Sequence, residues 1–199
     1  MEDTFKTITS VSKTIYTEKR SKFIAYAIPV QSVEEVKTEV DKLRKEYYDA
    51  RHACWAYMLG AEHKEFRAND DGEPSGTAGK PILGQINSND LTNILIVVIR
   101  YFGGIKLGTS GLIVAYREAA AEAISENEII EKTVDCQVSF SFEYPFMNDI
   151  MKIVKDTDAT ILNQSYDMDC AMALEIRKSL FDKLKSRLQK VESLQFIEK

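Results

Sequence analysis

The sequence is poor in cysteine and histidine. Its three cysteines, Cys54, Cys136 and Cys170, are odd in number and far apart, and there are only two histidines. These cysteines form no CxxC pair and no disulfide framework, a pattern that favours a reducing compartment. The first residues, Met1 to Phe5, are acidic and lack the apolar segment of a signal peptide. We therefore expect a cytoplasmic protein.

Long apolar runs and an excess of positive charge are also missing. The longest aliphatic stretch is Ile94 to Ile99, whereas a membrane helix needs about 20 apolar residues, so no membrane association is expected. The 26 Lys and Arg residues are outnumbered by 31 Asp and Glu residues, which gives a net charge of -5. This balance argues against indiscriminate binding of nucleic acid, although a local basic face is compatible with it.

Glycine is absent after residue 111. Eight of the nine glycines lie between Gly72 and Gly111. Glycine permits backbone angles and close approaches that other residues do not, and loops with such features often carry function. This stretch is therefore the first place to look for a site.

The residues that are present predict an α+β protein. Hydrophobic residues make up 44% of the 199 residues, enough for a folded core. Ser32 and Glu35 form a capping box before a helix with apolar positions from residue 33 to residue 47. The β-branched run at residues 93–102 predicts a strand buried on both faces. Other expected elements are strands at 5–10, 21–30, 53–59 and 65–68, a short helix or turn at 81–86, and a helix at 109–126.

The tail from residue 131 shows a pattern of its own. Its apolar periodicity predicts the order β-α-β-β-α-β, which is typical of a ferredoxin-like domain. We therefore expect two domains, residues 1–130 and 131–199. The expected tail strands are 134–142, 159–165, 170–176 and 194–197, and the expected helices span about 146–153 and 180–191.

The segment Arg100 to Leu112 is the strongest candidate for chemistry. It runs from the buried strand through a glycine loop into a helix start, where free N–H groups and the helix dipole can hold a phosphate or carboxylate. Arg100 and Lys106 can add positive charge, and Tyr101 or Phe102 can stack on a base. The spacing matches no nucleotide-binding motif, and a tight strand-to-helix turn explains the glycines equally well.

A second candidate is the loop Asn69 to Pro81, which contains the carboxylates of Asp70, Asp71 and Glu73. Three acids so close together can bind Mg²⁺ or act in acid–base chemistry. Their spacing is not that of an EF-hand, and a solvated loop is the simpler explanation. The length of this glycine- and proline-containing stretch nevertheless favours a function.

Two further groups of residues leave alternatives open. Strand alternation puts His52 and Cys54 on one face, where they can share a metal or form a nucleophile–base pair. A buried cysteine beside a hydrogen-bonded histidine is the simpler interpretation. In the tail, Lys183, Arg187 and Lys190 share one helix face, which fits a phosphate backbone or an ordinary solvated surface.

Three of these segments together resemble the YigZ/IMPACT family: Arg51 to Cys54, Asp70 to Pro81 and Arg100 to Gly108. The resemblance covers about residues 10–127, and the tail is similar to the small C-terminal domain of the bacterial members. It implies an N-terminal domain like domain 2 of ribosomal protein S five and a ferredoxin-like tail like the last domain of elongation factor G. It also implies a role in translation, because the eukaryotic relatives are translational regulators. It supplies no catalytic residue to carry over.

We expect one ligand site and no metal or cofactor. We favour a translation-associated regulatory or binding protein that contacts RNA or a ribosome-associated partner. A small-molecule hydrolase or phosphoryl-transfer enzyme and a regulator that binds only protein are the alternatives, and the oligomeric state is not determined by the sequence. A ligand site requires that His52, the acidic loop and the glycine loop surround one cleft. The candidate ligand-binding residues are His52, Asp70, Asp71, Glu73, Ser75, Thr77, Arg100, Tyr101, Gly103, Gly104, Lys106, Gly108 and Ser110.

Overall fold

The computed structural model describes residues 3–166 and 169–197. Its contacts divide the chain into two compact units, Phe5–Lys132 and Thr133–Lys199 together with the start of the chain. Each unit has its own sheet and its own helices, so the predicted α+β class is confirmed. The division into domains 1–130 and 131–199 stays a prediction.

The first unit contains seven of the strands and three of the helices. Strand β2 and the short strand β7 were not expected from the sequence, whereas the other elements lie close to their predicted positions. The bounds are β1 (Thr4–Ile8), β2 (Ser12–Glu18), β3 (Ser21–Pro29), α1 (Val33–Glu46), β4 (His52–Leu59), β5 (Glu65–Asn69), α2 (Gly79–Ser88), β6 (Ile94–Tyr101), α3 (Gly108–Ser125) and β7 (Ile129–Thr133).

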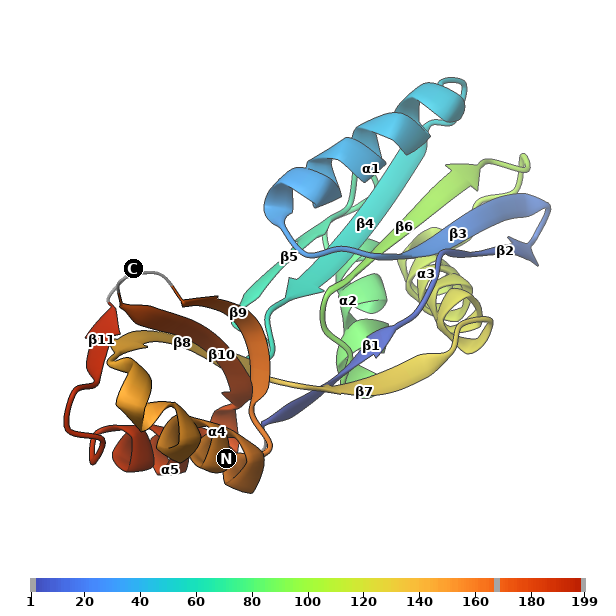
Figure 1. Ribbon diagram of the computed structural model, residues 1–199. Helices are drawn as coiled ribbons and strands as arrows, with labels where there is room; N and C mark the ends of the chain where they lie inside the picture. The colour runs from blue at the N-terminus through green and yellow to red at the C-terminus, as the bar shows by residue number, and fades with distance from the viewer. Residues whose placement is uncertain (1–2, 167–168, 198–199) are drawn as a thin grey trace. The chain divides into compact units, whose positions relative to one another are not determined.

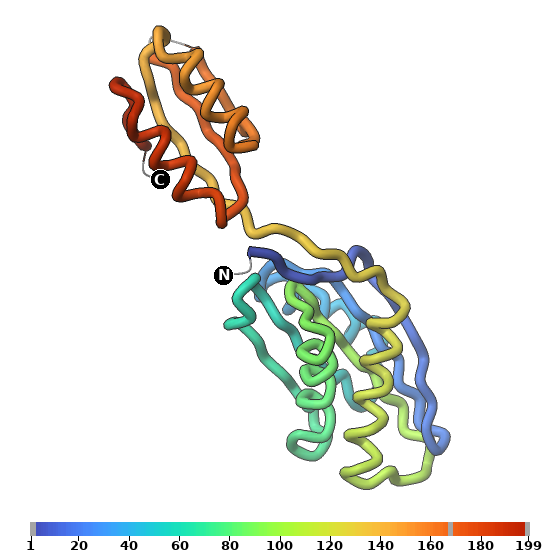
Figure 2. The backbone as a smooth tube through the Cα atoms, turned by 90° about the horizontal axis from the view of Figure 1, so that it is seen from below, coloured from blue at the N-terminus to red at the C-terminus, as the bar shows by residue number. Residues whose placement is uncertain are grey.

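Five of these strands form one antiparallel sheet in the order β2-β3-β6-β4-β5. Helix α1 covers one face of it, and α2 and α3 lie side by side on the other (Figures 1 and 2). The central strand β6 alternates between two cores, because Ile96 and Val98 pack towards α2 and α3 while Leu95 and Val97 pack towards α1. The predicted burial of this strand on both faces is therefore confirmed.

Helix α1 begins as its sequence predicts. The Ser32 hydroxyl accepts a hydrogen bond from the Glu35 N–H at 3.2 Å, and the Glu35 carboxylate accepts one from the Gln31 N–H at 2.7 Å. The buried side chains Val36, Val40 and Leu43 lie along one stripe of the helix. This cap and stripe hold α1 on the sheet face opposite the cleft described below.

The second unit has the predicted ferredoxin-like topology. Its sheet has the order β11-β8-β10-β9, with every neighbour antiparallel. Helices α4 and α5 supply Ile150, Val154, Leu184 and Leu188 to the core beneath this sheet. The bounds are β8 (Asp135–Phe142), a 3₁₀ turn at Tyr144–Phe146, α4 (Met147–Thr157), β9 (Thr160–Tyr166), β10 (Cys170–Arg177), α5 (Lys178–Leu188) and β11 (Gln195–Ile197).

The start of the chain joins the second unit through Asp3. Its carboxylate accepts hydrogen bonds from the Arg177 guanidinium at 2.6 and 2.7 Å and from the Ser179 N–H at 3.0 Å. Ser179 lies in the first turn of α5, where backbone N–H groups have no partner within the helix. Asp3 therefore accepts a hydrogen bond from the start of a helix that lies near the other end of the sequence. The hydrogen bonds from Arg177 and Ser179 hold the pKa of the Asp3 carboxyl well below its usual range.

We expect stability to depend on pH through Asp3. Its folded-state pKa is lower than the unfolded value of about 3.9, so its contribution is complete above that pH and is lost as the pH falls through the folded value. The stability advantage of the wild type over Asp3→Asn should therefore be full at about pH 7 and shrink below about pH 4. Urea unfolding over a pH series measures the difference in free energy of unfolding between the two proteins. Asp41→Asn is the control, because Asp41 lies on the exposed face of α1. An equal advantage at both ends of the series would contradict it.

Candidate functional site

Three neighbouring strands place the side chains at the centre of the site in one row. Phe23 of β3 and His52 of β4 are both in register with Arg100 of β6. The Arg100 guanidinium lies over the Phe23 ring, 5.6 Å from its centre, and 5.8 Å from the centre of the Phe102 ring. The sheet thus holds a cation on the face that α2 and α3 cover, at the end of strand β6.

Glu73, from the loop between β5 and α2, neutralises this cation. Its Oε1 atom lies 2.5 Å from Arg100 Nη1 and accepts a hydrogen bond from the Tyr116 hydroxyl of α3 at 2.8 Å. The Glu73 and Arg100 side chains are only 3% and 8% exposed. Burial raises the pKa of Tyr116, so its phenol stays protonated and donates. This network ties the acidic loop, the central strand and α3 together.

His52 is oriented by the backbone of the same loop. Its Nδ1 atom lies 2.8 Å from the Asp71 carbonyl oxygen, which can only accept, so Nδ1 carries the proton. The other ring nitrogen, Nε2, lies 3.9 Å from Glu73 Oε2. Gly72, at φ 84°, forms the turn beside the ring, where an L side chain would be strained.

The glycine loop between β6 and α3 places the start of α3 beside His52, Glu73 and Arg100. Gly104 and Gly108 have φ of 87° and 74°, which glycine adopts without strain. No side chain of the described residues caps α3, and its first turn, Gly108 to Gly111, contains no acidic residue. The first N–H groups of a helix lack intrahelical partners and carry partial positive charge. The loop therefore presents the positive end of an 18-residue helix.

These parts surround one cleft of about 370 Å³. Its charged side chains are three cations and one carboxylate, and the carboxylate already pairs with Arg100. In addition, Arg100 Nε is buried without a hydrogen-bond partner among the described residues. The lining residues are Arg51, His52, Glu73, Pro74, Arg100, Phe102, Lys106, Leu107, Gly108, Thr109 and Leu112.

The structure brings five of the predicted ligand-binding residues into this lining. They are His52, Glu73, Arg100, Lys106 and Gly108. Four other lining residues lie within segments that the sequence singled out but were not chosen individually, because an ordinary surface or core position explains each of them: Arg51, Leu107, Thr109 and Leu112. The predicted residues outside the lining are Asp70, Asp71, Ser75, Thr77, Tyr101, Gly103, Gly104 and Ser110.

The two aspartates of the acidic loop bind other parts of the protein. Asp70 accepts hydrogen bonds of 2.8–3.1 Å from backbone N–H groups in its own loop and at the start of α2. The Asp71 carboxylate accepts from the Ala53 N–H at 2.7 Å and from Arg44 at 2.6 Å. Thr77 donates its hydroxyl to a carbonyl of the same loop at 2.6 Å. These side chains shape the loop that carries Glu73.

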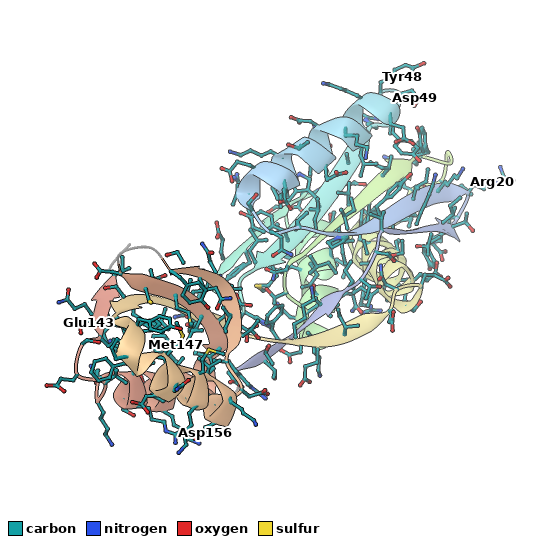
Figure 3. The ribbon with its side chains drawn as sticks, in the orientation of Figure 1. Arg20, Tyr48, Asp49, Glu143, Met147 and Asp156 are labelled. Carbon is teal, nitrogen blue, oxygen red and sulfur yellow. The ribbon has the colours of Figure 1, made fainter. Side chains whose placement is uncertain are left out.

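The two aromatic candidates for stacking differ in their surroundings. The Tyr101 hydroxyl donates to Asp49, labelled in Figure 3, at 2.7 Å, and this bond raises the pKa of Tyr101 to about 12. Phe102 lines the cleft and is 52% exposed. Phe102 is therefore the aromatic ring that a ligand in the cleft can reach.

Cys54 is a buried core cysteine, the simpler of the two interpretations that the sequence left open. It is fully buried, its sulfur lies 3.0 Å from the Asp70 carbonyl oxygen, and burial raises the pKa of the thiol. A protonated, inaccessible thiol is a core residue. The described residues contain no group of three His, Cys, Asp or Glu side chains suited to a metal ion, and among them no helix is long and apolar enough to cross a membrane.

Two of the three basic residues singled out in the tail, Arg187 and Lys190, lie in a hollow whose charges cancel. Arg187 pairs with Asp156 at 3.0 Å. With Lys190 it lines a hollow of about 450 Å³ beside α4 and α5. The charges of that hollow cancel, since its ionisable side chains are Asp149, Lys152, Asp156, Arg187, Lys190 and Glu192.

Comparison with known proteins identifies the family. Residues 19–124 match the family model described as the Impact N-terminal domain. The chain is 37% identical over 150 residues to "IMPACT family member YigZ" of Escherichia coli, covering 74% of each chain, and 33% identical over 183 residues to an "IMPACT family member" of Haemophilus influenzae, covering 88% of this chain and 86% of the other. A crystal structure titled as that of a hypothetical protein matches with a TM-score of 0.74 and 30% identity over the whole of both chains. The chain therefore belongs to the IMPACT family.

Proposed function

We propose that the protein is a translation-associated binding protein and that its cleft takes a phosphate group of RNA. The observation that carries this proposal is Arg100, a buried guanidinium that lines the same cleft as the start of α3. A guanidinium presents several N–H donors in a fixed planar geometry that suits the oxygens of a phosphate. The uncapped start of α3 adds N–H donors to the same cleft.

Charge supports an anionic ligand that binds locally. The lining has Arg51, Arg100 and Lys106 against Glu73 alone, whereas the whole chain has a net charge of -5. Such a protein attracts a phosphate into the cleft without coating its surface with nucleic acid. Because few phosphates are contacted, the RNA affinity should depend only weakly on salt. The slope of log K against log salt concentration is about 0.7 in magnitude for each phosphate contact on a single strand.

Phe102 supports a single-stranded nucleotide chain as the source of the phosphate. Its ring is half exposed and lines the cleft beside Arg100. Stacking of a base on an exposed aromatic ring contributes about 1–3 kcal/mol and requires an unpaired base. The association with translation rests on the resemblance to translational regulators.

Lys106→Ala should weaken binding of a short single-stranded RNA about tenfold at low salt, because one phosphate contact is lost. The salt slope should fall by about 0.7 for the same reason. Fluorescence anisotropy at several salt concentrations measures both values. Lys42→Ala is the matched control, since this lysine is 67% exposed on α1, across the sheet from the cleft. If Lys106→Ala and the wild type bound RNA with equal affinity, the proposal that RNA binds in the cleft would be contradicted. If the wild type bound no RNA, a protein partner would be favoured instead.

A further inference from the structure

His52 is placed to exchange a proton with whatever occupies the cleft. The Asp71 carbonyl fixes the proton on Nδ1, so in the neutral ring Nε2 carries the lone pair. The ring lines the cleft although its side chain is only 14% exposed. The charged side chains that line the cleft with it are Glu73, Arg51, Arg100 and Lys106. An oriented imidazole in such a position is the usual form of a general base.

The same cleft is built to stabilise negative charge. Arg100 is more than nine-tenths buried, and it shares one lining with the uncapped start of α3. Preorganised donors of this kind stabilise the charge that develops when a nucleophile adds to phosphorus. A base and a charge-stabilising pocket thus occur together.

We propose that the cleft cleaves RNA by activating the ribose 2′-hydroxyl next to the bound phosphate, an inference that rests on the proposed function. His52 Nε2 takes the 2′-hydroxyl proton, and the 2′ oxygen forms a bond to phosphorus. The bond from phosphorus to the 5′ oxygen breaks, and that oxygen takes a proton from solvent. His52 returns its proton to solvent. The products are a 2′,3′-cyclic phosphate and a 5′-hydroxyl, and neither water nor an oxidant is consumed.

The first test uses the wild-type protein and two substrates. One is a DNA oligonucleotide with a single ribonucleotide, and the other is the same oligonucleotide with a 2′-O-methyl group there. We expect cleavage after the ribonucleotide only, with a cyclic phosphate end detected by mass spectrometry. Binding of both without cleavage of either would overturn this inference alone, whereas binding of neither would overturn the proposed function with it.

The second test removes the proposed general base, His52 Nε2, and keeps the hydrogen bond to the Asp71 carbonyl. His52→Asn retains an N–H near the position of Nδ1 and lacks Nε2, so the cleavage rate at saturating protein should fall at least about 100-fold. His63→Asn is the control, since this histidine lies on a turn 3.9 Å from Asp90 and outside the cleft. Cleavage that survives in His52→Asn, or that falls equally in His63→Asn, would overturn the assignment.

Discussion

Glu73→Leu should lower the free energy of unfolding by about 3–5 kcal/mol, the usual cost of removing one partner of a buried ion pair. Arg100 would keep its charge with its side chain 8% exposed, and the Tyr116 hydroxyl would lose its acceptor. Urea unfolding followed by circular dichroism measures the change. Glu118→Leu is the matched control, because Glu118 is 45% exposed and pairs with an exposed arginine, and surface pairs contribute at most about 1 kcal/mol.

A second substitution separates loss of charge balance from loss of packing. Arg100→Met in the Glu73→Leu background removes the uncompensated charge and should recover much of the lost stability, since apolar replacement of a whole buried pair is often neutral. The double variant should at the same time lose RNA affinity. A Glu73→Leu protein as stable as the wild type would contradict the network described above.

Gly103→Ala should destabilise the protein by about 3 kcal/mol, at the upper end of the cost of overpacking. A Cβ atom at this position would lie 2.0 Å from the carbonyl carbon of Arg20 and 2.1 Å from its oxygen. Arg20 stands at the turn between β2 and β3, as Figure 3 shows. Both clashing atoms belong to the backbone, so the glycine loop or this turn must move.

A glycine in open surroundings provides the control for Gly103→Ala. Gly84 lies within α2, and a Cβ atom there would meet nothing within 4 Å. Gly84→Ala should therefore stabilise the protein by up to about 1 kcal/mol through helix propensity. In urea unfolding, we expect Gly103→Ala to lower the free energy of unfolding and Gly84→Ala to raise it. Equal effects of the two substitutions would show that the close approach at Gly103 is not required.

The parts of the fold with strong local signals were predictable. The apolar run of β6 and the Ser32 cap of α1 carry their structure in neighbouring residues. Strand β2 was missed because it is a half-exposed edge strand, and because Lys19 and Arg20 adopt positive φ of 46° and 65° in the turn that follows it. Such turns are usually marked by glycine or asparagine, so the sequence contains no hairpin signal here.

The site was predictable as a set of segments and less so as individual side chains. The loop motifs identified His52, Glu73 and Lys106, which the structure places in one cleft. The carboxylates of Asp70 and Asp71 looked equally suitable as ligands, yet they bind backbone N–H groups whose position depends on the path of the loop. The hydroxyl of Tyr116 and the cap by Asp3 involve partners distant in sequence, which no local pattern reveals.

The most direct test of the phosphate-binding cleft is NMR observation of Arg100 itself. The Nε–H signal of an arginine is resolved from backbone signals, so a short single-stranded RNA can be titrated while this donor is followed. The account predicts that the Arg100 Nε–H and the amides of Gly108 and Thr109 shift together with one dissociation constant. Saturating shifts confined to other surfaces, such as the lysines of α5, with the Arg100 signal unchanged, would contradict it.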